Sequence, residues 1–219
     1  MPMFSQLLLE NAKIAPEIFT LRPDYRALLL VVSNISPGPS DSISEALLQQ
    51  AEISARAALS TQSVTEISHV AAWRDTYKAF GAKPKKERSS LESLMRRAEA
   101  GLPRVNRLTD IYNALSVKFQ IPFGGEDLDK YDGVPVLVRA KGNEPFETSV
   151  GGEKVTEFPP EGEVVTGITE DTTRVLFIMD ALEPCDDANL EAAADELVEV
   201  LKSLGPGVSE ERRIMKRES

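Results

Sequence analysis

Residues 27–33 read ALLLVVS, and the first six of them form the longest uninterrupted apolar run in the chain. The loop Ser36–Ser40, which contains proline, glycine and serine, closes this run. A short apolar run that ends at turn-forming residues is typical of a strand buried on both faces. We therefore predict a buried strand here and expect the core of the fold to form around it.

Helical spacing of apolar residues follows this strand. Ser42 and Glu45 form a capping-box pattern, and Ser89 with Glu92 forms another. Each precedes apolar residues that recur every three or four positions, as on the buried face of an amphipathic helix. The predicted helices span about 42–58, 65–80 (ending before Gly81), 89–101 and, after Pro103, a segment that ends near Pro122.

Beyond residue 124 the apolar runs become shorter and glycines more frequent. The runs 134–138, 163–168 and 175–179 are typical of strands, and we interpret the pairs Gly124-Gly125 and Gly151-Gly152 as turns. A last helix is predicted over 188–204. The pattern favours one α+β domain over residues 1–208, followed by a polar tail over 209–219 that we expect to be frayed.

Composition excludes several classes of protein. With 219 residues, 42% hydrophobic and 27% charged, the chain is neither disordered nor fibrous. Its longest apolar run is far too short to cross a bilayer, so no membrane partner is expected. A single cysteine, Cys185, and a single histidine, His69, allow no internal disulfide and no four-ligand zinc site. We expect no bound metal and a reducing, cytoplasmic location.

The charge is unevenly distributed. The chain carries a net charge of −10, which opposes non-specific binding to DNA or to an anionic membrane. Between Arg74 and Arg107, however, ten basic residues face four acidic ones, a local excess of +6. Such a segment either holds phosphate groups or forms a solvated helical surface, and the charge pattern leaves both interpretations open.

No catalytic motif is complete in the sequence. His69 falls on a predicted helix beside Val70, where a structural role is the simpler interpretation. Glu163 precedes Thr169, Thr172 and Thr173, and a carboxylate with nearby hydroxyls can position a water for attack on an ester. The alternative is a half-exposed strand, in which threonine is favoured because it is β-branched.

Residues 71–133 resemble the free-standing relatives of the editing domain of the phenylalanyl-tRNA synthetase beta subunit. The resemblance extends over about residues 20–205 and is most specific in the centre. The motifs that carry it are Trp73-Arg74, Phe80-Gly81, Leu102-Pro103, Asp110-Ile111-Tyr112-Asn113, Gly124-Gly125, Asp127-Leu128 and Gly162-Glu163-Val164.

The resemblance implies a mixed α/β fold with a central sheet packed by helices. It also implies an aminoacyl-tRNA deacylase acting in trans, with a bound water as nucleophile and no metal or organic cofactor. Glu163 is similar to the glutamate of the family's Gly-Gly-Glu motif and would orient the water. The acceptor end of tRNA and its amino-acid moiety are the expected partners, and DNA is not.

The residues expected to bind the substrate are Thr169, Thr172, Asn113, Gly124 and Gly125. The residues expected to bind acceptor-stem phosphates are Lys83, Lys85, Lys86, Arg88 and Arg97. The synthetase domain has Pro-x-His where this chain has Pro122-Phe123-Gly124, so the family's imidazole is absent. A non-catalytic module that binds RNA or an amino acid is therefore the alternative hypothesis, and the sequence leaves the oligomeric state open.

Overall fold

The computed structural model describes residues 2–140, 146–150, 153–157, 163–164 and 166–217, with side chains over 4–140 and 166–217. Its helices are α1 (Pro2–Asn11), α2 (Pro16–Leu21), α3 (Ser42–Leu59), α4 (Ser68–Ala79), α5 (Ser90–Arg97), α6 (Arg107–Phe119) and α7 (Asp187–Ser203). Its strands are β1 (Lys13–Ile14), β2 (Arg26–Ser33), β3 (Phe123–Asp127), β4 (Val136–Leu137), β5 (Phe146–Val150), β6 (Glu153–Glu157), β7 (Glu163–Val164), β8 (Arg174–Ala181) and β9 (Ser209–Lys216).

A four-stranded antiparallel sheet forms the centre of the fold, in the order β3-β8-β2-β9. Strand β2 contains the apolar run from which the sequence analysis began, and it pairs with β8 on one side and β9 on the other. Its interior residues are all buried because both faces of the sheet are covered. Smaller sheets join β1 with β4 in parallel and β6, β5 and β7 in that order.

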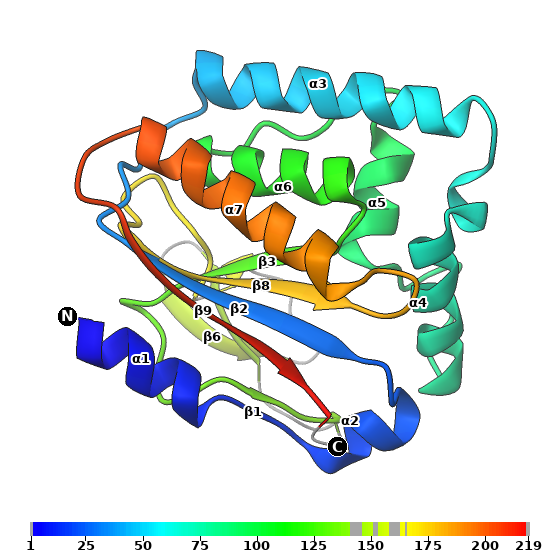
Figure 1. The fold of residues 1–219 in the computed structure, drawn as a ribbon, viewed down its shortest axis with the longest axis horizontal. Helices are drawn as coiled ribbons and strands as arrows, with labels where there is room; N and C mark the ends of the chain where they lie inside the picture. The colour runs from blue at the N-terminus through cyan, green and yellow to red at the C-terminus, as the bar shows by residue number, and fades with distance from the viewer. Residues whose placement is uncertain (1, 141–145, 151–152, 158–162, 165, 218–219) are drawn as a thin grey trace.

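The helices divide between the two faces of the main sheet (Figure 1). Leu28, Leu30 and Val32 of β2 face α6 and α7, and α3 lies above α6. The alternate residues Leu29 and Val31 face the opposite side, where α1 and α2 pack. Alternation along a strand thus divides the apolar residues between two cores. The predicted α+β class, a central sheet packed by helices, is confirmed.

Helices were predicted more accurately than short strands. The structure contains α3, α4, α5, α6 and α7 close to the predicted segments, and β2 and β8 as predicted. Among the described residues of the runs 134–138 and 163–168, only Val136–Leu137 and Glu163–Val164 are strands. Gly124 and Gly125 lie in β3, so their interpretation as a turn is wrong. The pairing of β3 with β8 determines their conformation, and this long-range contact has no local sequence signal.

The polar tail expected from residue 209 is instead the edge strand β9 over Ser209–Lys216. Its sequence, SEERRIMK, lacks the apolar run that identifies a buried strand, because β9 pairs with β2 alone among the described strands and most of its side chains are at least partly exposed. Pairing with β2 along its full length overrides this weak propensity. Among the described helices, none combines the length and the apolar character that a bilayer crossing requires.

Candidate active site

Strand β3 carries a carboxyl group in unusual surroundings. Phe123 and Gly125 face the core beneath α6, so Glu126 between Gly125 and Asp127 faces the opposite side of the sheet. Glu126 is half-buried, and its Oε2 atom has no hydrogen-bond partner among the described residues. Burial raises the pKa of the Glu126 carboxyl, and a hydrogen bond from the Thr166 side chain offsets only part of this shift. A buried oxygen without a partner is available to a water or a substrate.

The segment 166–168 runs along the outer edge of β3. Gly167 bridges to Glu126, and the backbone N–H of Asp127 donates to the Thr166 carbonyl at 2.7 Å. A Cβ atom on Gly125 would lie 2.5 Å from Cδ1 of Ile168 and 3.4 Å from Cδ1 of Phe177. Glycine at this position therefore allows Ile168 to pack on β3. Gly124 is different, because nothing lies within 4 Å of the position that its Cβ would take.

The turn that follows is fixed by hydrogen bonds of Thr172. Its hydroxyl donates to Asp127 Oδ2 at 2.8 Å and accepts from the Thr169 backbone N–H at 2.9 Å. Lys130 adds an ion pair to the same carboxylate oxygen at 3.2 Å and donates to the Gly167 carbonyl at 3.2 Å. With Thr172 only 2% exposed, these contacts give its hydroxyl a structural role in holding the turn.

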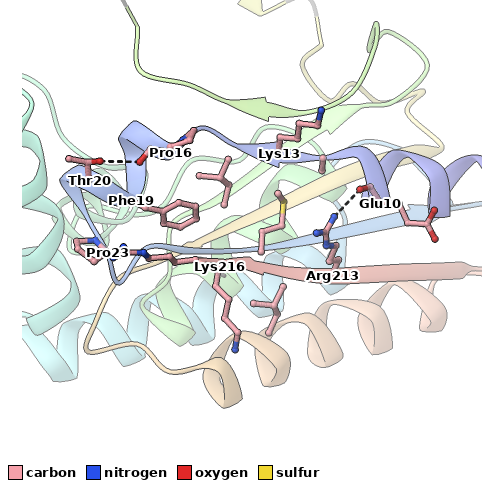
Figure 2. Close-up of a pocket in the computed structure, with 13 residues that line it drawn as sticks. Glu10, Lys13, Pro16, Phe19, Thr20, Pro23, Arg213 and Lys216 are labelled. Atoms are coloured by element: carbon pink, nitrogen blue, oxygen red, sulfur yellow. Dashed lines mark hydrogen bonds between the residues drawn. The ribbon is translucent and has the colours of Figure 1, made fainter. Parts of the chain in front are cut away.

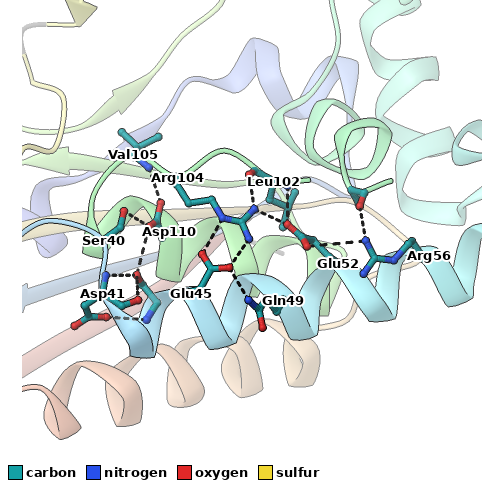
Figure 3. Close-up of polar contacts among 12 residues, drawn as sticks. Ser40, Asp41, Glu45, Gln49, Glu52, Arg56, Leu102, Arg104, Val105 and Asp110 are labelled. Atoms are coloured by element: carbon teal, nitrogen blue, oxygen red, sulfur yellow. Dashed lines mark hydrogen bonds and ion pairs between the residues drawn. The ribbon is translucent and has the colours of Figure 1, made fainter. Parts of the chain in front are cut away.

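The loop before α6 supports the same segment. Asn106 caps α6 through Oδ1, which accepts from the Thr109 N–H at 2.9 Å, while its Nδ2 donates to the Ile168 carbonyl at 3.3 Å. The fully buried Asp110 accepts from the Val105 N–H at 2.8 Å and from Ser40 Oγ at 2.5 Å (Figure 3). These contacts hold the loop both to α6 and to the segment between β2 and α3, which contains Ser40. The loop in turn positions Ile168 beside β3.

An arginine extends this polar network toward α3. Arg104 forms ion pairs with Glu45 at 2.8 Å and with Glu52 at 2.6 Å, and Glu52 also accepts from the Leu102 N–H at 2.8 Å (Figure 3). The Arg104 side chain lowers the pKa of the Glu45 carboxyl to about 2. Arg104 therefore helps to hold the loop 102–106 to α3 and is not available for a phosphate.

A second carboxyl lies on the same face as Glu126. Asp180 of β8 accepts a hydrogen bond from the Tyr25 hydroxyl at 2.5 Å. Burial raises the pKa of Asp180, and the Tyr25 hydrogen bond opposes this rise. Burial likewise raises the pKa of Tyr25. Asp180 already has a buried partner, which distinguishes it from Glu126.

His69 is structural, as the sequence suggested. It is 3% exposed, and its Nδ1 lies 2.7 Å from the Gln120 carbonyl oxygen. Its Nε2 accepts from Trp73 Nε1 at 3.2 Å and from the Leu182 N–H at 3.1 Å, so the proton resides on Nδ1. Burial lowers the pKa of His69 and keeps the ring neutral. Both nitrogens are occupied, and the ring cannot serve a substrate.

The predicted site residues are distributed as follows. The structure describes only the backbone of Glu163, in β7 opposite Ser149, and its side chain lies outside the described residues. Thr169 lies in the turn beside β3, with its hydroxyl 3.3 Å from that of Thr172. Asn113 is half-buried on α6 and makes no side-chain hydrogen bond within the described part of the chain. Thus Thr172 contacts Asp127 of β3, and Thr169 lies beside Thr172, while Gly124 and Gly125 belong to the same strand as Glu126 and Asp127.

Glu126 was not singled out from the sequence, although a signal was present. Residues 124–126 read Gly-Gly-Glu, the triplet that the resemblance assigned to the region of Glu163. The sequence alone predicts a turn at Gly124-Gly125 and assigns Glu126 no role. Only the pairing of β3 with β8 and with residue 167 shows that its glutamate is half-buried at a sheet edge.

The residues expected to bind RNA lie on the surface. Lys83, Lys85, Lys86 and Arg88 are exposed in the loop between α4 and α5, and Arg97 is exposed at the end of α5. Their neighbours Arg74 and Arg96 form ion pairs with the buried Glu92, at 2.7 and 2.8 Å, and Arg88 lies 3.9 Å from the same carboxylate. Some of the basic residues of this segment therefore stabilise the fold through ion pairs with Glu92. The exposed lysines of the loop remain accessible to a phosphate group.

Comparison with known proteins adds one result. Residues 72–166 match the model of the B3/4 domain, the domain family found in the phenylalanyl-tRNA synthetase beta subunit. The match contains all but the first four residues of α4 together with α5, α6 and β3, and therefore includes Glu126, Asn113 and the lysine loop, while Thr169 and Thr172 lie just beyond it. No curated protein matches the chain. The similarity is consistent with a tRNA-related function.

Proposed function

We propose that this chain hydrolyses, in trans, the ester bond that joins a wrong amino acid to tRNA. The match of residues 72–166 to the B3/4 domain supports the substrate class. The observation that carries the reaction is Glu126, whose carboxyl is half-buried at the edge of β3 with one oxygen that has no hydrogen-bond partner among the described residues. A carboxyl whose pKa is raised by burial is a stronger base once ionised than one in water.

In the proposed reaction Glu126 accepts a proton from a water molecule as that water attacks the ester carbonyl carbon. The carbonyl π electrons move to oxygen and form a tetrahedral intermediate. Its collapse breaks the bond to the ribose oxygen, which takes the proton back from Glu126. The products are a free amino acid and uncharged tRNA, and the carboxylate is regenerated.

The surrounding residues position the reacting groups. Thr172, Asp127 and Asn106 hold the segment 166–172 against β3, and we propose that Thr169 binds the substrate. Asn113 lies on α6, which packs on the face of the sheet opposite Glu126, and we assign it no part in the reaction at Glu126. The open space beside Gly124 leaves room for part of the amino acid. Glu163 is the second candidate for the base and is tested with Glu126 in the same experiment. The proposed substrate and the single cysteine both suit the cytoplasm.

The alternative function is a binding module without turnover. The chain has Gly124 in place of the family's histidine, and its only histidine is occupied by Gln120, Trp73 and Leu182. Such a protein would bind an aminoacyl-tRNA or its parts and release them unchanged. Binding assays on the same substrates distinguish it from a hydrolase.

The test is deacylation of a panel of mischarged tRNAs by the full chain and by the variants Glu126→Gln, Glu163→Gln and Glu170→Gln. Glu170 is the matched control, because it is exposed in the turn between Thr169 and Thr172 and makes no hydrogen bond or ion pair with a described side chain. We expect Glu126→Gln to lower kcat by about 10²- to 10⁴-fold, as for loss of a general base, and Glu170→Gln to leave it unchanged.

Each alternative has its own outcome. If Glu163→Gln removes the activity and Glu126→Gln does not, the base is Glu163. If the wild-type chain binds these tRNAs but hydrolyses none, the binding module is correct and the hydrolase proposal is wrong. Circular dichroism of each variant confirms that loss of activity is not loss of folding.

A further inference from the structure

Three aromatic residues follow one face of α4 and the residue after it: Trp73, Tyr77 and Phe80. Their spacing of four and then three residues places them on the same side of a helix. Trp73 and Tyr77 are half-buried, whereas Phe80 is 38% exposed. The ring centroids of Tyr77 and Phe80 lie 4.9 Å apart, with an angle of 46° between the ring planes. Tyr77 and Phe80 are called the aromatic pair below.

Phe80 differs from the other exposed phenylalanine of the described side chains. That residue is Phe4, and Arg174 lies over its ring at 5.0 Å from the centroid. Within the described part of the chain, no cation lies over the ring of Phe80. A single exposed apolar ring is common on protein surfaces and does not by itself indicate a site. The charge beside Phe80 is the second observation.

The loop that follows the aromatic pair is cationic and is held against α4. Residues 82–88, the lysine loop, contain four basic residues and one acidic residue, an excess of +3. The backbone N–H of Ala82 donates to the Tyr77 carbonyl at 2.9 Å, and the Arg74 side chain donates to the Pro84 carbonyl at 3.2 Å. These contacts fix the start of the loop beside the aromatic pair.

The lysines of this loop are available to a phosphate group. Lys83, Lys85 and Lys86 are exposed, and none of them forms an ion pair with another described residue. Phe80 precedes Lys83 by three residues, so their Cα atoms lie at most about 11 Å apart. An exposed ring and unpaired cations therefore lie close together on a chain whose net charge is −10.

The other end of the aromatic row lies beside strand β8. Trp73 packs edge-on against Tyr25, with ring centroids 6.4 Å apart, and the Tyr25 hydroxyl donates to Asp180 at 2.5 Å. Burial and the negative charge of Asp180 raise the pKa of Tyr77, so its phenol is also within electrostatic reach of that carboxyl. Asp180 and Glu126 lie on the same face of the sheet. The aromatic residues of α4 thus extend from the lysine loop toward the face that carries Glu126.

We propose that the aromatic pair stacks an unpaired nucleobase of the tRNA 3′ end while the lysine loop binds the phosphates beside it. The inference rests on the proposed function for the choice of tRNA as the ligand. Unpaired bases stack on aromatic side chains largely independently of sequence, and a single-stranded end leaves its bases available for such contacts. Phe80 would therefore be a positioning residue that orients the 3′ end toward Glu126, and it would take no part in the chemistry.

A second cationic surface does not fit an unpaired base. It lies at the opposite edge of the main sheet, between β9 and the N-terminal segment that contains β1 and α2 (Figure 2). Lys13 and Arg213 border it, but Phe19, the aromatic residue of its lining, packs against the core. Phosphates would be attracted there, but this lining presents no exposed aromatic ring on which a base could stack.

The experiment measures binding of two fluorescein-labelled RNA hairpins to the full chain by fluorescence anisotropy. One hairpin ends in the unpaired sequence CCA, as tRNA does. The other has abasic nucleotides in place of CCA, which keep the phosphates and remove the bases. The protein variants are Phe80→Ala and Phe80→Trp. Phe4→Ala is the matched control, because it removes an exposed phenylalanine outside residues 72–166.

We expect Phe80→Ala to weaken binding of the CCA hairpin about tenfold, as for loss of one stacked base. Phe80→Trp should retain the affinity, because an indole ring also stacks on a base, and Phe4→Ala should leave it unchanged. The abasic hairpin should bind wild type and Phe80→Ala equally well. A general disturbance of the fold would instead weaken the binding of both hairpins.

Equal weakening of both hairpins by Phe80→Ala, no weakening of either, or no binding of the CCA hairpin by wild type would overturn the proposal. Deacylation of mischarged tRNAs separates this failure from a failure of the proposed function. If the chain deacylates tRNA but its binding does not depend on Phe80, the stacking site is wrong and the hydrolase proposal stands. If the chain deacylates no tRNA but Phe80→Ala weakens only the CCA hairpin, the stacking site is supported and belongs to a binding module.

Discussion

Glu126 and Asp180 are two carboxyl groups on the same face of the sheet, and their surroundings give them different roles. Burial raises the pKa of both groups. Asp180 accepts the Tyr25 hydroxyl, whereas one oxygen of Glu126 has no described partner. An unsatisfied buried acceptor costs about 1–3 kcal/mol in stability, a cost that is tolerated mainly where a function requires the group.

Gly124 and Gly125 are adjacent in β3, yet we expect opposite responses to alanine. The Cβ of Gly125→Ala would lie 2.5 Å from Ile168 and must displace it, at a cost of about 1–3 kcal/mol. Gly124→Ala meets open space and, because alanine restricts the unfolded chain, should change stability by no more than about 1 kcal/mol. Urea denaturation of both variants measures the difference. Equal destabilisation would show that Ile168 does not pack on β3 as described.

Burial of the neutral His69 predicts a pH dependence of stability. Its folded pKa is lowered from 6.5, so as the pH falls below 6.5 the unfolded chain binds the proton first. The contribution of His69 to stability is therefore complete above about pH 6.5 and is lost toward lower pH, by at most about 1.4 kcal/mol per pH unit. Urea denaturation across this range tests the direction.

The control for this prediction is His69→Gln, which keeps hydrogen-bonding groups and removes the titration. Glu126 and Asp180 have raised pKa values and contribute to the pH dependence with the opposite sign: their stabilising effect is present at low pH and lost as the pH rises. Only the difference between wild type and His69→Gln reports on the imidazole. A difference that does not vary with pH would contradict the prediction.

At the scale of elements, the cap of α6 links a helix to the candidate site. Asn106→Ala removes the acceptor for the Thr109 N–H and the donor to the Ile168 carbonyl. We expect a loss of about 1 kcal/mol in stability and a further loss of deacylation, because the segment beside β3 is less firmly held. Denaturation and deacylation of the same variant measure the two effects.

The matched control is Asp186→Ala, which removes the cap of α7, where Asp186 accepts from the Asn189 N–H at 2.8 Å. It should cost a similar amount of stability without lowering deacylation. If the two variants lose equal activity, the contact from Asn106 to Ile168 has no specific role in the site.

A comparison of the elements also shows which local sequence signals are sufficient to predict a helix or a strand. The sequence predicted the helices α3 and α5, which both have a continuous apolar face. Ser89 caps α5 as predicted, whereas Asp41 with Ser44 caps α3 and the predicted pair of Ser42 and Glu45 does not. The strands β4 and β7 lie within the predicted runs 134–138 and 163–168 but span only two residues each, and the polar strand β9 has no comparable period. They exist because a partner strand lies beside them, a condition that a window of sequence cannot contain.

At the scale of the molecule, the distribution of charge predicts how tRNA would bind. Lys85 and Lys86 are exposed in the loop between α4 and α5, while Arg74 and Arg96 are held by Glu92. The double variant Lys85→Gln, Lys86→Gln should weaken tRNA binding and reduce the slope of log K against log salt by about 2, about one unit for each phosphate contact. A salt titration of binding measures the slope.

Lys202→Gln is the control, since Lys202 is exposed on α7 and outside the segment that matches the B3/4 domain. It should leave the slope unchanged. An equal change in both proteins would mean that net charge, and not the lysine loop, governs binding of tRNA.

The sequence by itself determined the α+β class, the buried strand β2, the helices α3 to α7 and the structural character of His69. These follow from periods and caps within a few residues, because local sterics and the alternation of apolar residues specify them. The tertiary structure alone decided that 209–216 is a strand, that Gly125 must be glycine beside Ile168, and that Glu126 is half-buried with one oxygen lacking a partner in the described part of the chain. Each depends on residues brought together from distant parts of the chain, and burial is a property of that packing.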